Sequence, residues 1–142
     1  MKDLQFHATI NAPKQNVWDT MLDRETYKEW TGAAWPGSDY EGTWKKDTEI
    51  RFGGPDGSGM LAKVTEFELY DTITLQHNAV LDKGGVVAMD LNATPGIEQY
   101  VFAENNGVTE LTINLRIDEE WAEMFENDWP IALAKLKEVA ER

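Results

Sequence analysis

Cysteine is absent from the 142 residues, and basic side chains are scarce. Without cysteine there can be no disulfide, no thiol nucleophile and no thiolate metal ligand. The 13 lysine and arginine residues stand against 26 aspartate and glutamate residues, which gives a formal charge of -13. Such a surface repels phosphate backbones and anionic lipids, because affinity for both depends mainly on cationic side chains. We therefore expect neither a nucleic-acid partner nor a membrane partner.

Long apolar runs are missing as well. No stretch approaches the roughly 20 apolar residues of a membrane span, and residues 1–5 lack the apolar core of a secretion signal. We therefore expect a cytoplasmic location. The two histidines, His7 and His77, lie far apart in the sequence and lack the spacing of a metal site. Accordingly, no metal and no cofactor are expected.

What the chain does contain is typical of one globular domain, residues 1–142. A hydrophobic content of 42% is enough for a core and too high for a disordered chain. Aromatic residues make up 11% and include six tryptophans. Large flat side chains either fill a core or line a pocket, so this content leaves both uses open.

Apolar residues alternate with polar ones in the first strand, residues 4–10, and again in several later segments. Pro13 is suited to the first turn of a helix, and the apolar spacing predicts short helices over 13–22 and 24–30. Between residues 82 and 95 the pattern is poor and indicates a loop or an irregular edge. The remaining strands are predicted over residues 38–44, 48–52, 60–69, 72–81, 97–104 and 108–117.

The last segment, residues 119–142, has one apolar stripe with charged residues opposite and predicts a long amphipathic helix. Pro130 lies inside this pattern and should kink or break the helix. One amphipathic helix cannot cover so wide a sheet if the sheet is flat. Burial is best if the antiparallel sheet curls around the helix. The expected α+β fold therefore has a partly open space between the long helix and the concave face of the sheet.

Several short motifs occur in a characteristic order along the chain. They are Ile10-Asn11-Ala12-Pro13, Val17-Trp18, Trp30, Gly57-Ser58-Gly59-Met60 with Val64 and Glu66, Glu123-Met124-Phe125, Trp129-Pro130, Leu133, Leu136-Lys137 and Ala140-Glu141. Taken together, these motifs resemble the START-like or SRPBCC superfamily. The ending is similar to the branch named after the C-terminal domain of the activator of heat-shock protein 90 ATPase.

This resemblance implies the helix-grip fold: about seven antiparallel strands around the C-terminal helix, with two short helices closing one end. It also implies a cavity of the kind that takes lipids, sterols, polyketides or plant hormones. A minority of such proteins are enzymes, among them polyketide cyclases and aromatases. The heat-shock activator carries a further N-terminal domain that these 142 residues do not include, which argues against a co-chaperone role. Homodimers occur in the superfamily, although nothing in the sequence requires one.

The residues expected to line the cavity come from five segments. Trp30 and Trp35 flank residues 31–34, a loop that would close the cavity mouth. Plain core packing is the alternative for the tryptophans. The full set is Trp30, Trp35, His77, Tyr100, Phe102, Ile113, Phe125 and Trp129.

Two residues are candidates for acid–base chemistry. His77 shares a strand face with Ile73 and Leu75, which alternation makes the inward face, although an inward histidine is often only hydrogen-bonded to a neighbour. Glu66 shares a face with Met60 and Val64, and a carboxylate in such an apolar setting would suit proton transfer. A bulge in this strand would instead turn Glu66 outward.

Three functions are compatible with these residues. The leading one is a module that binds a small apolar or aromatic ligand between the sheet and the C-terminal helix. The second is a cyclase- or hydrolase-type enzyme that uses His77 or Glu66 in the same cavity, without metal. The third is a chaperone accessory that contacts a heat-shock ATPase as a protein partner. The sequence does not identify the ligand.

Overall fold

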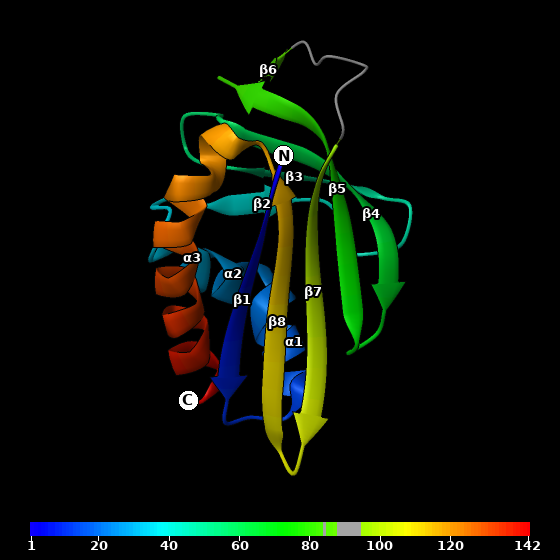
Figure 1. Ribbon diagram of the computed structural model, residues 1–142, viewed down its shortest axis with the longest axis vertical. Helices are drawn as coiled ribbons and strands as arrows, with labels where there is room; N and C mark the ends of the chain where they lie inside the picture. Colours follow the sequence, from blue (N-terminus) through cyan, green and yellow to red (C-terminus); the bar gives the residue numbers. More distant parts are fainter. Residues whose placement is uncertain (84, 88–94) are drawn as a thin grey trace.

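The computed structural model describes residues 1–83, 85–87 and 95–142 (Figure 1). The predicted α+β helix-grip fold is confirmed. The elements in chain order are β1 (Lys2–Ile10), α1 (Lys14–Leu22), α2 (Arg24–Gly32), β2 (Asp39–Glu41), β3 (Glu49–Gly53), β4 (Gly59–Glu68), β5 (Thr72–Asp82), β6 (Gly85–Val87), β7 (Gly96–Asn105), β8 (Val108–Ile117) and α3 (Glu119–Ala140).

Among the described residues, the strands form one antiparallel sheet in the order β1-β8-β7-β5-β4-β3-β2, and β6 pairs with β5 off this path. The path thus contains the seven strands that were predicted. Hairpins join β3 to β4, β4 to β5 and β7 to β8, and the β7–β8 turn places Asn106 and Gly107 at φ 54° and 80°. These left-handed conformations suit Asn-Gly in a tight hairpin turn. The first strand, β1, is at one edge of the sheet and pairs with β8, from Lys2 opposite Ile117 to Ile10 opposite Thr109.

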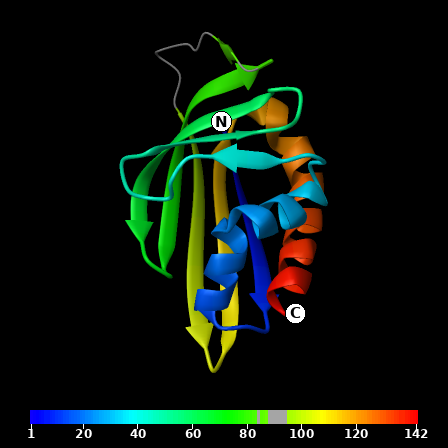
Figure 2. The same cartoon turned by 180° about the vertical axis from the view of Figure 1, so that it is seen from behind.

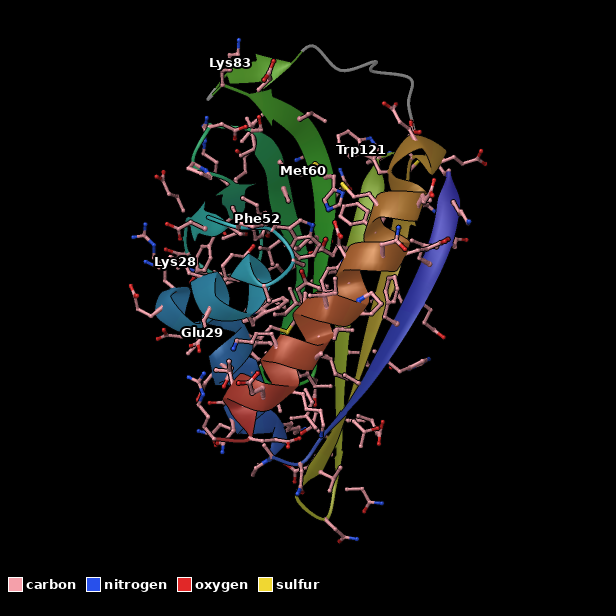
Figure 3. The ribbon with its side chains drawn as sticks, turned by 90° about the vertical axis from the view of Figure 1, so that its left-hand side faces the viewer. Lys28, Glu29, Phe52, Met60, Lys83 and Trp121 are labelled. Carbon is pink, nitrogen blue, oxygen red and sulfur yellow. The ribbon has the colours of Figure 1, made fainter. Side chains whose placement is uncertain are left out.

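The long helix α3 lies beside β1 and α2 and runs along one side of the sheet (Figures 1 and 3). Asp118 caps it by accepting a hydrogen bond from the backbone N–H of Glu120 at 3.0 Å. The helix continues without interruption through Pro130, so the alternative of a break there is wrong. Pro130 is exposed, as is Glu126 one turn earlier. The carbonyl that loses its helical partner therefore lies on the face that water can hydrate.

The part of the interior beneath α1 is filled by side chains. Figure 2 shows α1 and α2 in front of the sheet, on the side from which α3 is also seen. Trp18 of α1 is buried, and its ring centroid lies 5.4 Å from Phe67 and 5.1 Å from Phe102. Ile113 is also fully buried in this cluster. The space between α1 and the sheet is therefore packed with apolar side chains.

Two predicted segments differ from the structure. The strand expected over residues 38–44 is only the three residues of β2, because Gly42 at φ 131° takes a conformation outside the strand region. Within the poorly patterned stretch 82–95, β6 forms a short strand against β5, while residues 84 and 88–94 lie outside the described residues. In the part of the chain that the structure describes, no helix is long and apolar enough to cross a membrane.

Candidate functional site

A hollow of about 1450 Å³ opens between the sheet, α2 with the loop after it, and the N-terminal half of α3. Figure 3 shows Met60 of β4 and Trp121 of α3 near each other at the upper part of this space. The residues that line the hollow include Met1, Tyr27, Trp30, Ala34, Trp35, Ser38, Phe52, Met60, His77, Asp82, Gly96, Glu98, Tyr100, Asp118, Trp121, Met124, Phe125 and Trp129.

Three tryptophans form an aromatic wall. Trp129 of α3 lies 6.1 Å from Trp30 of α2 and 5.5 Å from Trp35, measured between ring centroids. Their orientation is fixed by hydrogen bonds: Trp30 Nε1 donates to the carbonyl of Met21 at 3.2 Å, and Trp35 Nε1 donates to Asp128 at 3.2 Å. The buried Nε1 of Trp129 has no hydrogen-bond partner among the described residues. Trp30 and Trp129 are only 2% and 3% exposed, whereas Trp35 is partly exposed, so the wall is a packed, rigid border of the hollow. An apolar border of this kind suits an apolar or aromatic molecule.

Polar groups gather on the inner side of β5 and β7. The hydroxyl of Tyr100 donates a hydrogen bond to Oε2 of Glu98, two residues earlier on the same strand face. His77 of β5 places its Nε2 3.7 Å from Oε1 of Glu98. Exposed fractions are low, at 12% for the His77 side chain, 17% for the Glu98 side chain and 4% for Tyr100. A carboxylate, an imidazole and a phenol thus meet in a poorly hydrated corner.

Two further features shape this polar corner. Burial, followed by the negative charge of Glu98, raises the pKa of Tyr27, which therefore stays a neutral phenol. Gly96 lies directly opposite His77 in the β5–β7 register. A Cβ atom at Gly96 would lie only 2.8 Å from His77 Nδ1. The absence of a side chain there lets the imidazole lie flat against β7 beside Glu98.

The rim of the hollow is apolar and exposed. Met1, Trp121 and Met124 are 49%, 43% and 39% exposed, and all three line the opening. Large exposed apolar side chains that cluster at an opening are typical of a binding site.

Six of the predicted cavity residues do line the hollow: Trp30, Trp35, His77, Tyr100, Phe125 and Trp129. Phe102 and Ile113 do not belong to its lining. Both are buried in the core: Phe102 packs against Trp18, and Ile113 lies between Tyr100 and Phe6 in the sheet register. Their placement in the core is a correction to the predicted site.

Glu66 does not lie in the hollow. The β4–β5 register pairs Val64 with Leu75 and Glu66 with Thr74, which leaves Thr65 as an extra residue in β4. This bulge reverses the alternation, so that Phe67 packs inward against Trp18 and Glu66 points outward. Glu66 is exposed and accepts a hydrogen bond from the Thr74 hydroxyl at 2.8 Å. Of the two placements that the sequence left open, the structure has the one with a bulge, and Glu66 is not on the concave face.

Glu98 and Tyr27 belong to the site although the sequence patterns did not single them out. A signal for Glu98 was present, because strand alternation places it on the same face as Tyr100, which was expected to point inward. Tyr27 falls in the second predicted helix, and no pattern there assigned it to the cavity. Within residues 1–83, 85–87 and 95–142, no group of three or more potential ligands is arranged to hold a metal ion.

The chain has structural relatives over nearly its whole length. It aligns with protein CV1439 from Chromobacterium violaceum at a TM-score of 0.76 and 15% identity, covering 100% of this chain and 99% of that one. The Aha1 dimer from Colwellia psychrerythraea aligns at 0.76 and 17% identity, covering 99% and 97%. DynU16, from the dynemicin biosynthetic locus, aligns at 0.75 and 12% identity, covering 99% of this chain and 48% of DynU16.

These identities are low, so the structural likeness shows a common fold. No curated protein sequence matches the chain significantly. The decisive comparison is with a family model, that of the Activator of Hsp90 ATPase homolog 1-like proteins, which matches residues 11–141. This chain belongs to the Activator of Hsp90 ATPase homolog 1-like family, within the START-like/SRPBCC superfamily.

Proposed function

We propose that this protein, as a single domain, is a binding module for a small apolar or aromatic molecule held in the hollow. One observation carries the proposal: a hollow of about 1450 Å³ with an aromatic border opens beside the N-terminal half of α3, while the interior beneath α1 is packed by Trp18, Phe67 and Phe102. Family membership and the helix-grip fold support a ligand-binding module in general. A structural neighbour from a biosynthetic locus is consistent with a small-molecule ligand.

The hollow is large enough for a ligand to bury an apolar area that contributes several kcal/mol to binding. A two-ring aromatic ligand of about 250 Å² would gain about 6 kcal/mol of transfer free energy on full burial, before the cost of association. Trp30, Trp35 and Trp129 are held in place by packing before any ligand arrives. Little side-chain entropy is therefore lost on binding, which favours affinity.

The experiment is a thermal-shift screen of delipidated protein against sterols, fatty acids, flavonoids and polyketide-like aromatics. A ligand at 100-fold over its dissociation constant adds about 2.7 kcal/mol and raises the melting temperature by about 9 °C. Each hit is then tested on Ala34→Phe, which places a ring in the lining of the hollow. The matched control is Ala103→Phe, at an exposed position of β7.

Binding that is lost in Ala34→Phe and kept in Ala103→Phe supports the hollow as the site. Equal affinity in both variants contradicts the proposal, because a ligand in the hollow must compete with the new ring. A complete absence of hits would mean that the space does not serve small molecules, and a protein partner would become the leading function.

The polar corner favours a second candidate, an enzyme of cyclase or hydrolase type. His77 lies 3.7 Å from Glu98, which in turn accepts a hydrogen bond from Tyr100. An imidazole beside a carboxylate is suited to general acid–base catalysis. The discriminating measurement is turnover of compounds that bind. Turnover that is lost in His77→Ala while affinity is kept supports catalysis, whereas binding without turnover supports the module.

A role as an accessory of a heat-shock ATPase stays a prediction. The name of the family supports it. The measurement is ATP hydrolysis by a purified heat-shock ATPase with and without this protein at low salt, where the charge of -13 favours steering toward a basic surface. An unchanged rate and no detectable complex would contradict it.

A further inference from the structure

We propose that the ligand of the hollow is a cation: an aromatic compound with a protonated amine, whose ammonium group binds Glu98 while its rings lie against the tryptophan wall. This inference rests on the proposed function, since it names the chemical class of the ligand for the same site. Two observations carry it. The charged side chains that line the hollow are mainly carboxylates, and one of them, Glu98, accepts fewer hydrogen bonds than a carboxylate can.

The charges around the hollow are almost all negative. Among the described residues that line it, there are three carboxylates and neither lysine nor arginine. Residues 84 and 88–94, which the structure does not describe, contain no lysine or arginine in the sequence. The remaining nitrogen groups that can be charged are the amino group of Met1, at the exposed rim, and His77 when protonated. The three carboxylates are Asp82, Glu98 and Asp118.

Glu98 is the carboxylate that lies deepest. Its Oε2 accepts the hydrogen bond from Tyr100, while its Oε1 is 3.7 Å from His77 Nε2, beyond hydrogen-bond distance. No other described residue donates to Glu98. An ionised carboxylate accepts about four hydrogen bonds, and this side chain is only 17% exposed. A ligand ammonium would therefore satisfy acceptor capacity that neither the protein nor bulk water fully supplies, in a charge-assisted bond.

The surrounding rings favour the same charge. The faces of tryptophan, tyrosine and phenylalanine attract cations through their quadrupoles. Four aromatic residues that could make such contacts line the hollow: Tyr27, Trp30, Phe125 and Trp129. The phenol of Tyr27 stays neutral, because burial and the charge of Glu98 raise its pKa. An anionic ligand of equal size would meet the repulsion of Glu98 without a fixed lysine or arginine to offset it.

The test uses three probes that share one aromatic body: 2-naphthylmethylamine, 2-naphthalenemethanol and 2-naphthoate. Dissociation constants are measured by isothermal titration calorimetry with the full chain, at about 150 mM and again at about 500 mM sodium chloride. The amine should bind at least tenfold more tightly than the alcohol, and the acid should bind most weakly. High salt screens attraction to the acidic surface, so that a preference produced inside the hollow should persist.

Two glutamate variants show whether the preference for the amine over the alcohol arises at Glu98. Glu98→Gln should weaken the affinity for the amine at least tenfold, while the affinity for the alcohol changes less than threefold. The matched control is Glu110→Gln, an exposed carboxylate on β8 that accepts hydrogen bonds from Thr9 and does not line the hollow. This variant removes the same formal charge and should leave all three dissociation constants unchanged.

The outcomes separate this inference from the function on which it rests. If the alcohol or the acid binds as tightly as the amine, the inference is overturned while the binding module stands. The inference also fails if Glu110→Gln weakens the amine as much as Glu98→Gln does, since the general surface charge would then explain the preference. If none of the three probes binds, this inference fails, whereas the binding module fails only if the thermal-shift screen also gives no hit. Should Glu98→Gln not fold, the ratio of amine to acid affinity in the unaltered protein still decides the question.

Discussion

Replacing Tyr100 by phenylalanine should destabilise the protein although it removes only one oxygen atom. The hydroxyl donates to Glu98, and the ring is 4% exposed. Removal of a donor to a charged, poorly hydrated acceptor typically costs about 1–3 kcal/mol, because the acceptor loses its partner without regaining full hydration. We expect about 2 kcal/mol for Tyr100→Phe, with the ring itself still in place against Trp129.

The assay is urea unfolding followed by tryptophan fluorescence. With a slope of about 2 kcal/mol/M, a loss of about 2 kcal/mol moves the midpoint down by about 1 M. Tyr70→Phe is the matched control, because Tyr70 contacts the Trp18 ring but its hydroxyl makes no hydrogen bond to any described residue. We expect the control to change the free energy of unfolding by less than about 0.5 kcal/mol.

A double-mutant cycle isolates the interaction. In a Glu98→Gln background, Tyr100→Phe should cost at least about 1 kcal/mol less than in the unaltered chain, because the charged acceptor is gone. Equal losses for Tyr100→Phe and Tyr70→Phe would refute the reasoning. So would additive effects in the cycle, since they would show that Tyr100 and Glu98 do not stabilise one another.

Three further predictions concern other parts of the molecule. Glu66→Gln should change stability by less than about 0.5 kcal/mol and leave probe binding unchanged, because the side chain is exposed outside the hollow; a large loss of binding by calorimetry would contradict the corrected placement. Arg24 lowers the pKa of Asp39 below its ordinary 3.8 through hydrogen bonds at 3.0 and 2.8 Å. The ion pair therefore stabilises the fold above pH 3.8, and this contribution is lost as the pH falls through the folded pKa. Stability of Arg24→Gln should thus fall less steeply with acid, and parallel curves from about pH 7 to about pH 2 would count against this. The homodimer prediction, supported by a family member solved as a dimer, requires twice 16.1 kDa in light scattering; a monomer mass at high concentration would exclude it.

Most of the fold was accessible from the sequence because its signals are local. Alternation in residues 4–10 and 108–117 predicted β1 and β8, and these strands do pair along their length. The apolar stripe of the last helix includes Trp129, Leu133 and Leu136, all of which are buried. The strand around Tyr40 was predicted too long, because the left-handed conformation of Gly42 depends on how the chain must turn toward β3.

The site was less accessible, and two particular residues show why. Alternation placed Glu66 inward, and a single extra residue at Thr65 turned it outward. Bulges depend on how two strands fit each other in the sheet, so one strand read alone does not reveal them. Glu98 presents the opposite case, because alternation assigns its face correctly. What alternation cannot give is that this face borders the hollow at Glu98 and the packed core at Phe102.

The sequence by itself determined the order of elements, the side of each regular strand that is apolar, the acidic surface and the resemblance to the family. Each of these depends on residues that are neighbours along the chain or on composition alone. Tertiary structure alone decided which end of the concave face stays open, which residues meet as His77, Glu98 and Tyr100, and how deeply each is buried. These features depend on contacts between β5, β7, α2 and α3, elements separated by many residues, whose relative positions follow from packing and not from any local pattern.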